Sequence, residues 1–505
     1  MSLPGLGLEE PEEVHTVEAT QHELTQETEW RFEVAVGKYV QVKLLTGSAE
    51  LFGTELVIGN TYTFTGTKAA IYTWNGCLFQ VSGDALQSEY IAEETPMSEY
   101  INTHFSLESL RSQAQATGHE GPRVLILGPE NAGKTSLAKI LTGYASRSAR
   151  SPVVVNLDVK EGVMSIPGTL TATVFKTLMD VEEGWGTAPM SGPNGAIPVK
   201  LPLVYFFGSS KPEEKEGRVY KAQMNRLALA VAGRRAQDPE ARESGIIIDT
   251  PGSLTALKSG NTVGYDIIQD IVSEFAVSAI ICMGSERLYS DMVKRFDGQP
   301  TAFRPASSST TTTKADTISV IKLAKSGGCV DRDEAFMTAF RAAQIKTYFY
   351  GNARLSNGIS LQPRHQQVDF STLTVWRRIG TTPDPFSAAA SLDPDDEDSF
   401  LPGGTGDDAD ETSPSKVPLP ESQIFERMTS PIAAMRSSVL AVMNCDGEAE
   451  QEVIRDSTVM GFLYVTDTDE ARGRISLLSP VAGRVPSRAI VWAGWPESVI
   501  GLERT

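Results

Sequence analysis

One stretch of the sequence decides the fold: VLILGPENAGKT, which runs from Val124 to Thr135. Its first four residues are continuously apolar, as in a strand that is buried on both faces. Residues 128–135 then fit the pattern G-x-x-x-x-G-K-[ST], and a helical pattern begins at Lys134. Strand, glycine loop and helix in this order predict a phosphate-binding loop in a three-layer α/β domain.

The residue types in this loop suit a nucleoside triphosphate. Glycines let backbone N–H groups turn toward the phosphates, Lys134 can reach the β- and γ-phosphate oxygens, and the Thr135 hydroxyl can coordinate Mg²⁺. We therefore expect ATP and Mg²⁺ as cofactors. A glycine turn that matches the pattern by chance is the alternative, and the strand and helix around it argue against that. The residues expected to bind the cofactor are Gly128, Asn131, Ala132, Gly133, Lys134, Thr135 and Ser136.

Further apolar runs follow the loop. They cover residues 153–157, 246–248, 279–283 and 318–323, and helical patterns lie between them, clearest in residues 267–275. Strands that alternate with helices favour a parallel sheet with helices on both faces. The sequence thus predicts a central α/β domain in residues 119–351, built on a parallel sheet.

The flanking regions have other patterns. In residues 29–83 apolar and polar residues alternate between glycine turns, which predicts a small antiparallel β domain within residues 1–118. Strands are also expected in a third domain, residues 352–505, at 438–443, 461–465, 475–478 and 489–492. Residues 381–412 are rich in Asp and Glu and contain no Lys or Arg, so we expect this acidic insert to be disordered.

Two aspartates follow apolar strands: Asp158 comes after residues 153–157, and Asp249 after residues 246–248. Because the carboxyl ends of parallel strands face the ligand crevice of an open α/β sheet, both are expected near the nucleotide. Asp249 is predicted to belong to the metal shell, with a structural turn cap as the alternative. Asp158 is predicted either to orient an acceptor hydroxyl or to bind Mg²⁺ through water, with a capping role as the alternative.

Two more features bear on the reaction class. Arg287 follows residues 279–283 on an expected helix, where kinases of this sheet type place a lid over the phosphates, although a solvated basic helix face has the same composition. Residues 249–252 (DTPG) resemble a GTPase switch motif, and residues 313–316 (TKAD) resemble the guanine-reading motif of GTPases. The second match precedes an apolar strand instead of following one, so a GTPase is disfavoured.

Composition limits the class of protein further. A formal net charge of −19 argues against indiscriminate binding of nucleic acid over the whole surface, because that affinity comes from neutralising phosphates. A local basic groove could still contact RNA. No apolar run of about 18 residues occurs, so no membrane contact is expected.

Several phrases in the sequence are more specific than the loop. They are AELFGTEL at 49–56, SIPG at 165–168, YFYG at 348–351 and PVAGR at 480–484. On these phrases the chain resembles the polynucleotide 5′-hydroxyl-kinase family over nearly its whole length, the acidic insert excepted. It is most similar to the fungal branch, the ATP-binding subunit of cleavage factor IA in pre-mRNA cleavage and polyadenylation.

The resemblance implies a β-sandwich in front, the nucleotide-binding domain in the middle and a small α/β domain behind. It also implies that the front domain contacts the adenine through Glu29 and Lys68, which from their own context would be interpreted as exposed charges on strands. The implied partners are the other subunits of the cleavage and polyadenylation factor, especially its large scaffolding subunit. The implied location is nuclear.

The chain departs from kinase-active members of that family at two places. They carry D-x-x-Q-G after the second strand, whereas residues 158–162 read DVKEG, with Glu161 in place of glutamine. They also carry a tryptophan that clamps nucleic acid, where this chain has Ser253. The like charge near the phosphates and the loss of a stacking platform worth about 1–3 kcal/mol per base both affect an acceptor site more than a nucleotide cradle.

Two hypotheses follow. In the first, which we favour, bound ATP and Mg²⁺ hold the front and central domains together, and the composite surface binds other processing subunits without kinase turnover. In the second, an active kinase transfers the γ-phosphate to a 5′-hydroxyl of RNA, with Asp158 as the base and with Lys134 and Arg287 on the transferred group.

Overall fold

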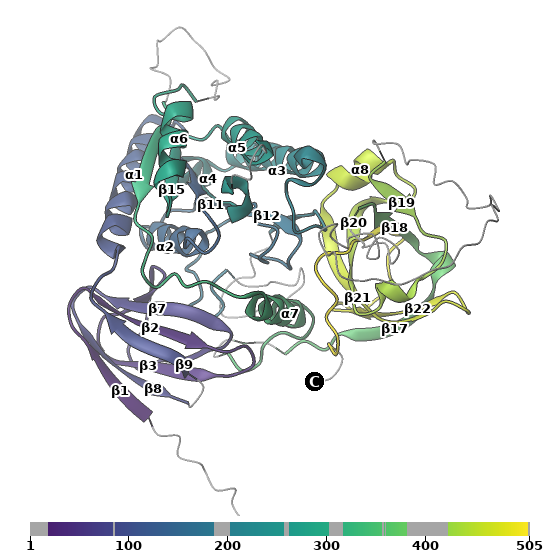
Figure 1. Ribbon diagram of the computed structural model, residues 1–505, viewed down its shortest axis with the longest axis horizontal. Coiled ribbons are helices and arrows are strands. Elements are labelled where there is room, and N and C mark those ends of the chain that lie inside the picture. Colours follow the sequence, from purple (N-terminus) through teal and green to yellow (C-terminus); the bar gives the residue numbers. More distant parts are fainter. Residues whose placement is uncertain are drawn as a thin grey trace, which may run out of the picture.

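The computed structural model describes residues 19–83, 86–185, 202–256, 262–301, 317–355, 358, 360–380 and 423–502. Figure 1 shows three parts in chain order: an N-terminal β-sandwich, a central α/β domain and a C-terminal sheet domain. The predicted acidic insert at 381–412 and the guanine-motif match at 313–316 lie outside the described residues.

The N-terminal sandwich packs a four-stranded sheet, in the order β1-β8-β3-β6, on a five-stranded sheet, in the order β5-β4-β7-β2-β9. In β3 buried and exposed residues alternate from Val40 to Leu44, so one face joins a core that includes Trp30 and Phe79. The predicted antiparallel β domain is confirmed. The strands are β1 (Ala19–Leu24), β2 (Thr28–Val34), β3 (Val40–Gly47), β4 (Glu50–Leu51), β5 (Thr54–Glu55), β6 (Thr61–Phe64), β7 (Thr67–Thr73), β8 (Cys77–Ser82) and β9 (Leu86–Ala92).

The central sheet has the strand order β13-β12-β11-β14-β10-β15-β16. The five strands from β11 to β16 in this order are parallel, as predicted, but β12 and β13 pair antiparallel, so the whole sheet is mixed. Residues 157–168 join β11 to β12 without a helix, and a parallel neighbour needs a longer crossover, usually helical. The strands are β10 (Arg123–Leu127), β11 (Val153–Asn156), β12 (Thr169–Val174), β13 (Leu203–Phe206), β14 (Ile246–Asp249), β15 (Ala279–Met283) and β16 (Ser319–Leu323).

Helices cover both faces of this sheet. Along β10, Val124 and Ile126 pack in the cluster that contains α1 and α2, whereas Leu125 and Leu127 pack in the cluster that contains α3, α5 and α6. Burial on both faces explains why this strand is apolar without alternation. The helices are α1 (Met97–Thr117), α2 (Lys134–Arg147), α3 (Arg218–Gln237), α4 (Pro239–Ser244), α5 (Val263–Glu274), α6 (Glu286–Phe296) and α7 (Glu334–Tyr350), with 3-10 turns η1 (Glu214–Gly217) and η2 (Gly252–Thr255).

The C-terminal domain contains a seven-stranded sheet in the order β17-β22-β21-β20-β23-β18-β19, antiparallel except between β18 and β23. The four strands predicted there coincide with β20 to β23. Its described residues include one short α-helix, so this part is a sheet domain and less helical than the α/β domain that the resemblance implied. The elements are β17 (Arg364–Asp369), η3 (Phe370–Thr372), β18 (Thr374–Arg378), β19 (Phe425–Arg427), η4 (Ala433–Met435), β20 (Val439–Asp446), α8 (Gln451–Asp456), β21 (Val459–Asp469), β22 (Arg474–Ser479) and β23 (Arg488–Trp492).

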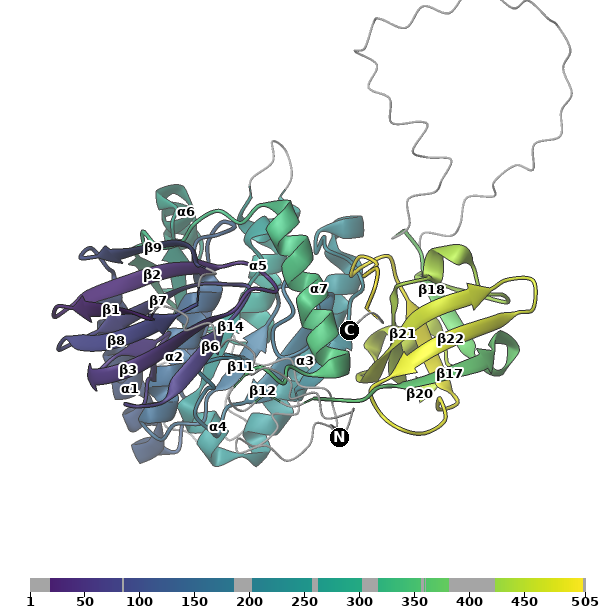
Figure 2. The same cartoon turned by 90° about the horizontal axis from the view of Figure 1, so that it is seen from below.

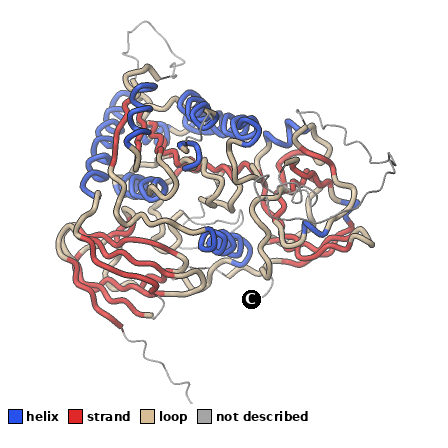
Figure 3. Tube along the Cα trace, in the orientation of Figure 1, coloured by secondary structure: helices blue, strands red, loops and turns tan. Residues whose placement is uncertain are grey.

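Helix α7 explains why this domain needs so little helix of its own. Ile345, Tyr348 and Phe349 of α7 are buried in the same core as Val439 and Tyr464 of the C-terminal sheet. In the two perpendicular views α7 lies between the N-terminal sandwich and the C-terminal domain (Figures 1 and 2). Most of the helix in Figure 3 belongs to the central domain. Within the described residues, no helix has the length and hydrophobicity to cross a membrane.

Candidate nucleotide-binding site

The predicted phosphate loop joins β10 to the first turn of α2. Asn131 and Gly133 adopt positive φ angles of 56° and 87°, which turn the backbone back on itself. At Gly128 a Cβ atom would lie 2.8 Å from the carbonyl oxygen of Met283, so the residue must be glycine. The Lys134 Nζ donates a hydrogen bond of 2.8 Å to the Pro129 carbonyl, which holds the ammonium group inside the loop.

The loop opens into a cavity of about 330 Å³, which is lined mainly by three segments and also by side chains from residues 95–100 and 158–161. The N-terminal sandwich contributes Glu29 and Lys68, the loop contributes residues 131–136, and the third wall comes from the residues between β16 and the middle of α7. We call residues 326–337 of this wall the closing segment. It lies directly on the loop, because a Cβ atom at Gly133 would come within 2.6 Å of the Cys329 sulfur. The absence of a side chain at Gly133 thus leaves room for the closing segment above the phosphate loop.

Two of the predicted metal residues are in contact: Thr135 lines this cavity, and Asp249 lies directly beside Thr135. The Thr135 Oγ1 donates a hydrogen bond of 2.6 Å to Oδ2 of Asp249, whose other carboxylate oxygen accepts from the Thr250 backbone N–H at 3.0 Å. Asp249 is 3% exposed, and this burial raises its carboxyl pKa to about 6. A buried carboxylate beneath a threonine hydroxyl provides the hard oxygen atoms that Mg²⁺ prefers. The residues therefore fit the metal ion predicted from the sequence.

Asp158 lines the same cavity at the carboxyl end of β11. Its Oδ1 accepts a hydrogen bond of 2.9 Å from the Lys160 backbone N–H, and its own N–H donates to the Asn156 side chain at 3.1 Å. Burial, followed by the negative charge of Glu161, raises the pKa of the Asp158 carboxyl to about 7. The Asp158 carboxyl therefore binds its proton more tightly than an exposed aspartate does.

An ion pair that we did not predict from the sequence closes one side of the cavity. The Arg332 guanidinium of the closing segment pairs with Glu161 and donates a hydrogen bond of 3.2 Å from Nε to the Asn131 side chain in the loop. Lys139 of α2 also lines the cavity, and burial lowers the pKa of its ammonium group. The one signal for Arg332 in the sequence is its place nine residues after the strand predicted at 318–323, which ends at the ligand edge of the sheet.

Glu29 and Lys68 line the cavity opposite the phosphate loop, but neither is freely exposed, contrary to the interpretation from their local context. Glu29 is 4% exposed and accepts hydrogen bonds from Arg31 Nε at 2.6 Å and from Thr95 Oγ1 at 3.0 Å. Lys68 pairs with Glu33 at 3.1 Å and places its ammonium group over the ring of Phe336, 5.2 Å from the ring centre. Phe336 belongs to the closing segment, so Lys68 joins the sandwich to it.

Arg287 and Ser253, two other positions singled out from the sequence, are not among the residues that line the cavity. Arg287 is exposed in the first turn of α6 and does not line the nucleotide cavity, so the structure does not bring it to Lys134 and Asp158. Ser253 lies in η2, directly beside the loop, since a Cβ atom at the neighbouring Gly252 would meet the Glu130 backbone nitrogen at 2.4 Å. Among the described residues, the arginines that line this cavity are Arg332 and Arg341.

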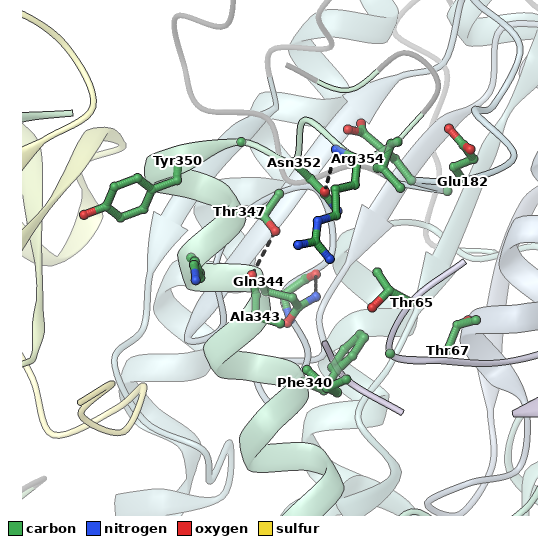
Figure 4. A pocket seen from close by; sticks show the side chains of 18 of the residues that line it. Thr65, Thr67, Glu182, Phe340, Ala343, Gln344, Thr347, Tyr350, Asn352 and Arg354 are labelled. Atoms are coloured by element: carbon green, nitrogen blue, oxygen red, sulfur yellow. Dashed lines mark hydrogen bonds between the residues drawn. The ribbon is translucent and has the colours of Figure 1, made fainter. Parts of the chain in front are cut away.

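A second, larger cavity of about 1170 Å³ adjoins the first. Figure 4 shows its side chains on α7, including Phe340, Gln344 and Thr347, facing Thr65 and Thr67 of the sandwich. The Gln344 side chain donates a hydrogen bond of 2.6 Å to the Gly162 carbonyl. Residues that line both cavities form their common wall, and they are Phe52, Gly66, Thr67, Thr135, Lys139, Glu161 and Phe340.

Comparison with known protein families matches each part of the chain in turn. Residues 23–114 match the N-terminal β-sandwich domain of polyadenylation factor. Residues 128–351 match the P-loop domain of mRNA cleavage and polyadenylation factor CLP1. Residues 361–497 match the pre-mRNA cleavage complex II protein Clp1.

Individual relatives extend over almost the whole chain. The mRNA cleavage and polyadenylation factor clp1 of Aspergillus oryzae is 47% identical, covering 99% of this chain and 100% of the relative. The protein of the same name from Aspergillus niger is 50% identical, covering 97% and 98%. The fold is similar to that of Clp1p in its wild-type complex with Pcf11p, with a TM-score of 0.75 at 24% identity, covering 95% of this chain and 98% of that one. The chain belongs to the Clp1 family of mRNA cleavage and polyadenylation factors.

Proposed function

We propose that this chain is the nucleotide-holding subunit of a nuclear mRNA 3′-end cleavage and polyadenylation complex, with ATP and Mg²⁺ as a structural cofactor. The observation that carries this proposal is the single cavity lined by the front sandwich, the phosphate loop and the closing segment. A ligand in that cavity contacts all three segments at once. It stabilises their arrangement by RT ln(1 + [L]/Kd), which requires no hydrolysis.

The two ends of the cavity suit different parts of the nucleotide. At the loop, Lys134 and the backbone N–H groups of residues 131–136 would hold the phosphates. Thr135 would coordinate Mg²⁺ directly, with Asp249 and Asp158 acting through bound water. The bound ion would supply positive charge beside these buried carboxylates. At the sandwich end, Glu29 and Lys68 would contact the adenine.

The ion pair between Glu161 and Arg332 supports a structural role for the nucleotide. It joins the loop after β11 to the closing segment and lies at the wall shared with the second cavity, where Glu161 is a lining residue of both. In this pair Glu161 occupies an arginine that the phosphates of a polynucleotide would otherwise contact. The site thus favours holding a nucleotide over admitting an acceptor.

The partner follows from the family. Solved relatives include Clp1p in complex with Pcf11p, and a second structure concerns the extended interface of the same two proteins and the ATP loss of a glycine-to-arginine point mutant. We propose that this chain likewise binds a large scaffolding subunit of the complex. Since cleavage and polyadenylation of mRNA take place in the nucleus, we also propose a nuclear location.

The test compares nucleotide retention with phosphate transfer. The purified chain is denatured and any released nucleotide is identified, and the native protein is then incubated with γ-labelled ATP and 5′-hydroxyl RNA. We expect retained ATP and no labelled RNA. An absence of bound nucleotide, or unchanged ATP affinity in Lys134→Ala, contradicts the proposal.

A second candidate function is an active polynucleotide 5′-hydroxyl kinase, and one observation favours it. Asp158 lines the cavity with a pKa of about 7, which suits a general base at neutral pH. The same transfer assay decides between the two functions. Labelled RNA that disappears in Asp158→Asn, with ATP binding retained, would establish the kinase and exclude a purely structural nucleotide.

A further inference from the structure

Among the contacts of the described residues, Arg332 is the only residue of the closing segment whose side chain contacts both the phosphate loop and residues 158–162, which follow β11. It lies immediately before α7, whose N-cap Asp333 accepts from the Phe336 backbone N–H at 2.6 Å. The side chain is 27% exposed and lines the nucleotide cavity. The helix cap fixes the backbone next to the arginine, while its guanidinium group keeps access to the cavity.

The charges around Arg332 are not equivalent. Glu161 is the carboxylate that forms an ion pair with Arg332 among the contacts of the described residues. Burial acts to raise the pKa of Glu161, but the charge of Arg332, its hydrogen bond and the lysines of α2 together lower it. Asp158 and Asp249 instead accept hydrogen bonds from backbone N–H groups, and Asp249 also accepts one from Thr135.

A carboxylate that pairs with arginine in an anion-binding site occupies a position where a phosphate could bind. Guanidinium groups bind carboxylate and phosphate with the same planar pairs of N–H donors, and a phosphate carries more charge. Glycine loops of this type surround the β- and γ-phosphates, and Asn131, which accepts from Arg332, is the fourth of the eight loop residues. The charge of Lys134 also acts on Glu161 and Asp158, so the lysine and the arginine flank the same region.

We propose that Arg332 distinguishes nucleoside triphosphate from nucleoside diphosphate, exchanging its ion pair with Glu161 for one with the terminal phosphate. Glu161 holds the guanidinium when that phosphate is missing and competes with it when it is present. The proposal rests on the proposed function, because it requires a nucleotide in this cavity. The closing segment would thus distinguish nucleotides by the number of their phosphates.

Nucleotide affinity tests the exchange directly. Binding of ATP and of ADP, each with Mg²⁺, is measured by calorimetry for the full chain after nucleotide removal, and for Arg332→Ala and Glu161→Gln. We expect Arg332→Ala to weaken ATP binding about tenfold or more while ADP binding changes less than twofold, since an arginine–phosphate hydrogen bond contributes about 1.5–3 kcal/mol. Glu161→Gln should strengthen ATP binding severalfold, because the competing charge is gone. Arg218→Ala, which removes an exposed arginine on α3, serves as the matched control and should change neither affinity.

The outcomes distinguish the role of Arg332 from nucleotide binding itself. Equal weakening of ATP and ADP in Arg332→Ala, or no change in either, overturns the phosphate-reading role while leaving nucleotide binding established. Glu161→Gln that weakens ATP binding also overturns it, and a folding defect cannot imitate the expected gain. If the unmodified chain binds neither nucleotide, the proposed function itself fails.

Discussion

Thr135, which lines the nucleotide cavity, donates a hydrogen bond to Asp249, with 2.6 Å between Oγ1 and Oδ2. Thr135→Val keeps the shape of the side chain and removes the oxygen that would bind Mg²⁺. We expect ATP affinity in the presence of Mg²⁺ to fall at least tenfold, with little change in EDTA. Calorimetric titrations with and without Mg²⁺ provide the measurement.

The matched control for this substitution lies two turns along the same helix. The Thr142 hydroxyl donates to the Ala138 carbonyl at 2.7 Å and does not line the cavity. Thr142→Val should leave Mg²⁺-dependent binding unchanged. Equal losses in the two variants would show that the effect comes from α2 and not from the metal ion.

Asp158 and Asp249 make the stability of the nucleotide-free protein depend on pH. Their folded-state pKa values, about 7 and about 6, lie above the ordinary value of 3.8, so the folded state binds these protons more tightly than the unfolded state. Their contribution is present at low pH and is lost as the pH rises through 6 and 7. We expect Asp158→Asn to remove part of this loss, on the order of 1–2 kcal/mol because the carboxyl is partly exposed.

Urea unfolding between pH 5.5 and 8, without nucleotide and with EDTA, measures this dependence. The original protein should lose more stability across the range than the variant does. Parallel pH profiles would mean that Asp158 has the same proton affinity in the folded and unfolded states. Added ATP and Mg²⁺ should reduce the difference, since the metal ion favours the ionised carboxyls.

The residues of the phosphate loop could be located from sequence because their spacing is fixed by the backbone they must form. Asp158 and Asp249 could also be placed near the nucleotide, since strand ends meet at one edge of a parallel sheet. The position of Arg332 is not fixed in that way, because it lies nine residues beyond the end of β16. It acts from a loop whose course depends on the sandwich, which Gly327 and Gly328 approach at Arg31. Arg287, chosen by analogy with a lid, lies on α6 outside the cavity.

At the scale of elements, α2 joins the phosphate loop to the sandwich. Its first residues form the cradle, and near its end Tyr144 and Arg147 donate to Glu50 of β4, which is 3% exposed. Tyr144→Phe leaves a buried carboxylate with one donor fewer. We expect a loss of about 1–3 kcal/mol in unfolding free energy, measured with urea.

The control for Tyr144→Phe is Tyr265→Phe on α5, whose hydroxyl donates to Asp291 at 3.1 Å in a partly exposed place far from the sandwich in sequence. It should cost less, about 0.5–1 kcal/mol, because water can replace the lost donor. If both variants lost the same stability, the contact with Glu50 would have no special role in docking the sandwich on α2.

The element pattern shows why some of the fold could be predicted and some could not. Apolar runs gave β10, β11, β14, β15 and β16 because buried parallel strands need no polar face. The antiparallel turn into β12 left no signal, as it depends on the absence of a helix between residues 157 and 168. The sequence did not indicate how little helix the C-terminal domain has. Its sheet packs on α7, and α7 lies before the predicted domain boundary at residue 351.

For the whole molecule, nucleotide should act as a stabiliser of domain arrangement. At a free concentration of ATP and Mg²⁺ a hundred times Kd, the expected gain in unfolding free energy is about 2.7 kcal/mol. Thermal unfolding followed with and without nucleotide measures it. The gain should vanish in Lys134→Ala and persist in Lys38→Ala, where the lysine is exposed on the sandwich. A gain of equal size in the two variants would place the binding site elsewhere.

The position of α7 has a consequence for how the protein is made. The nucleotide cavity needs Glu29 from near the start of the chain and Arg332 from beyond its middle, and α7, which follows Arg332, is covered only when the C-terminal sheet has folded. In a chain that is still emerging from the ribosome, the phosphate loop is therefore present before the closing segment and α7 are held in place. We therefore expect the proposed binding of ATP to become firm only after all three parts have been synthesised.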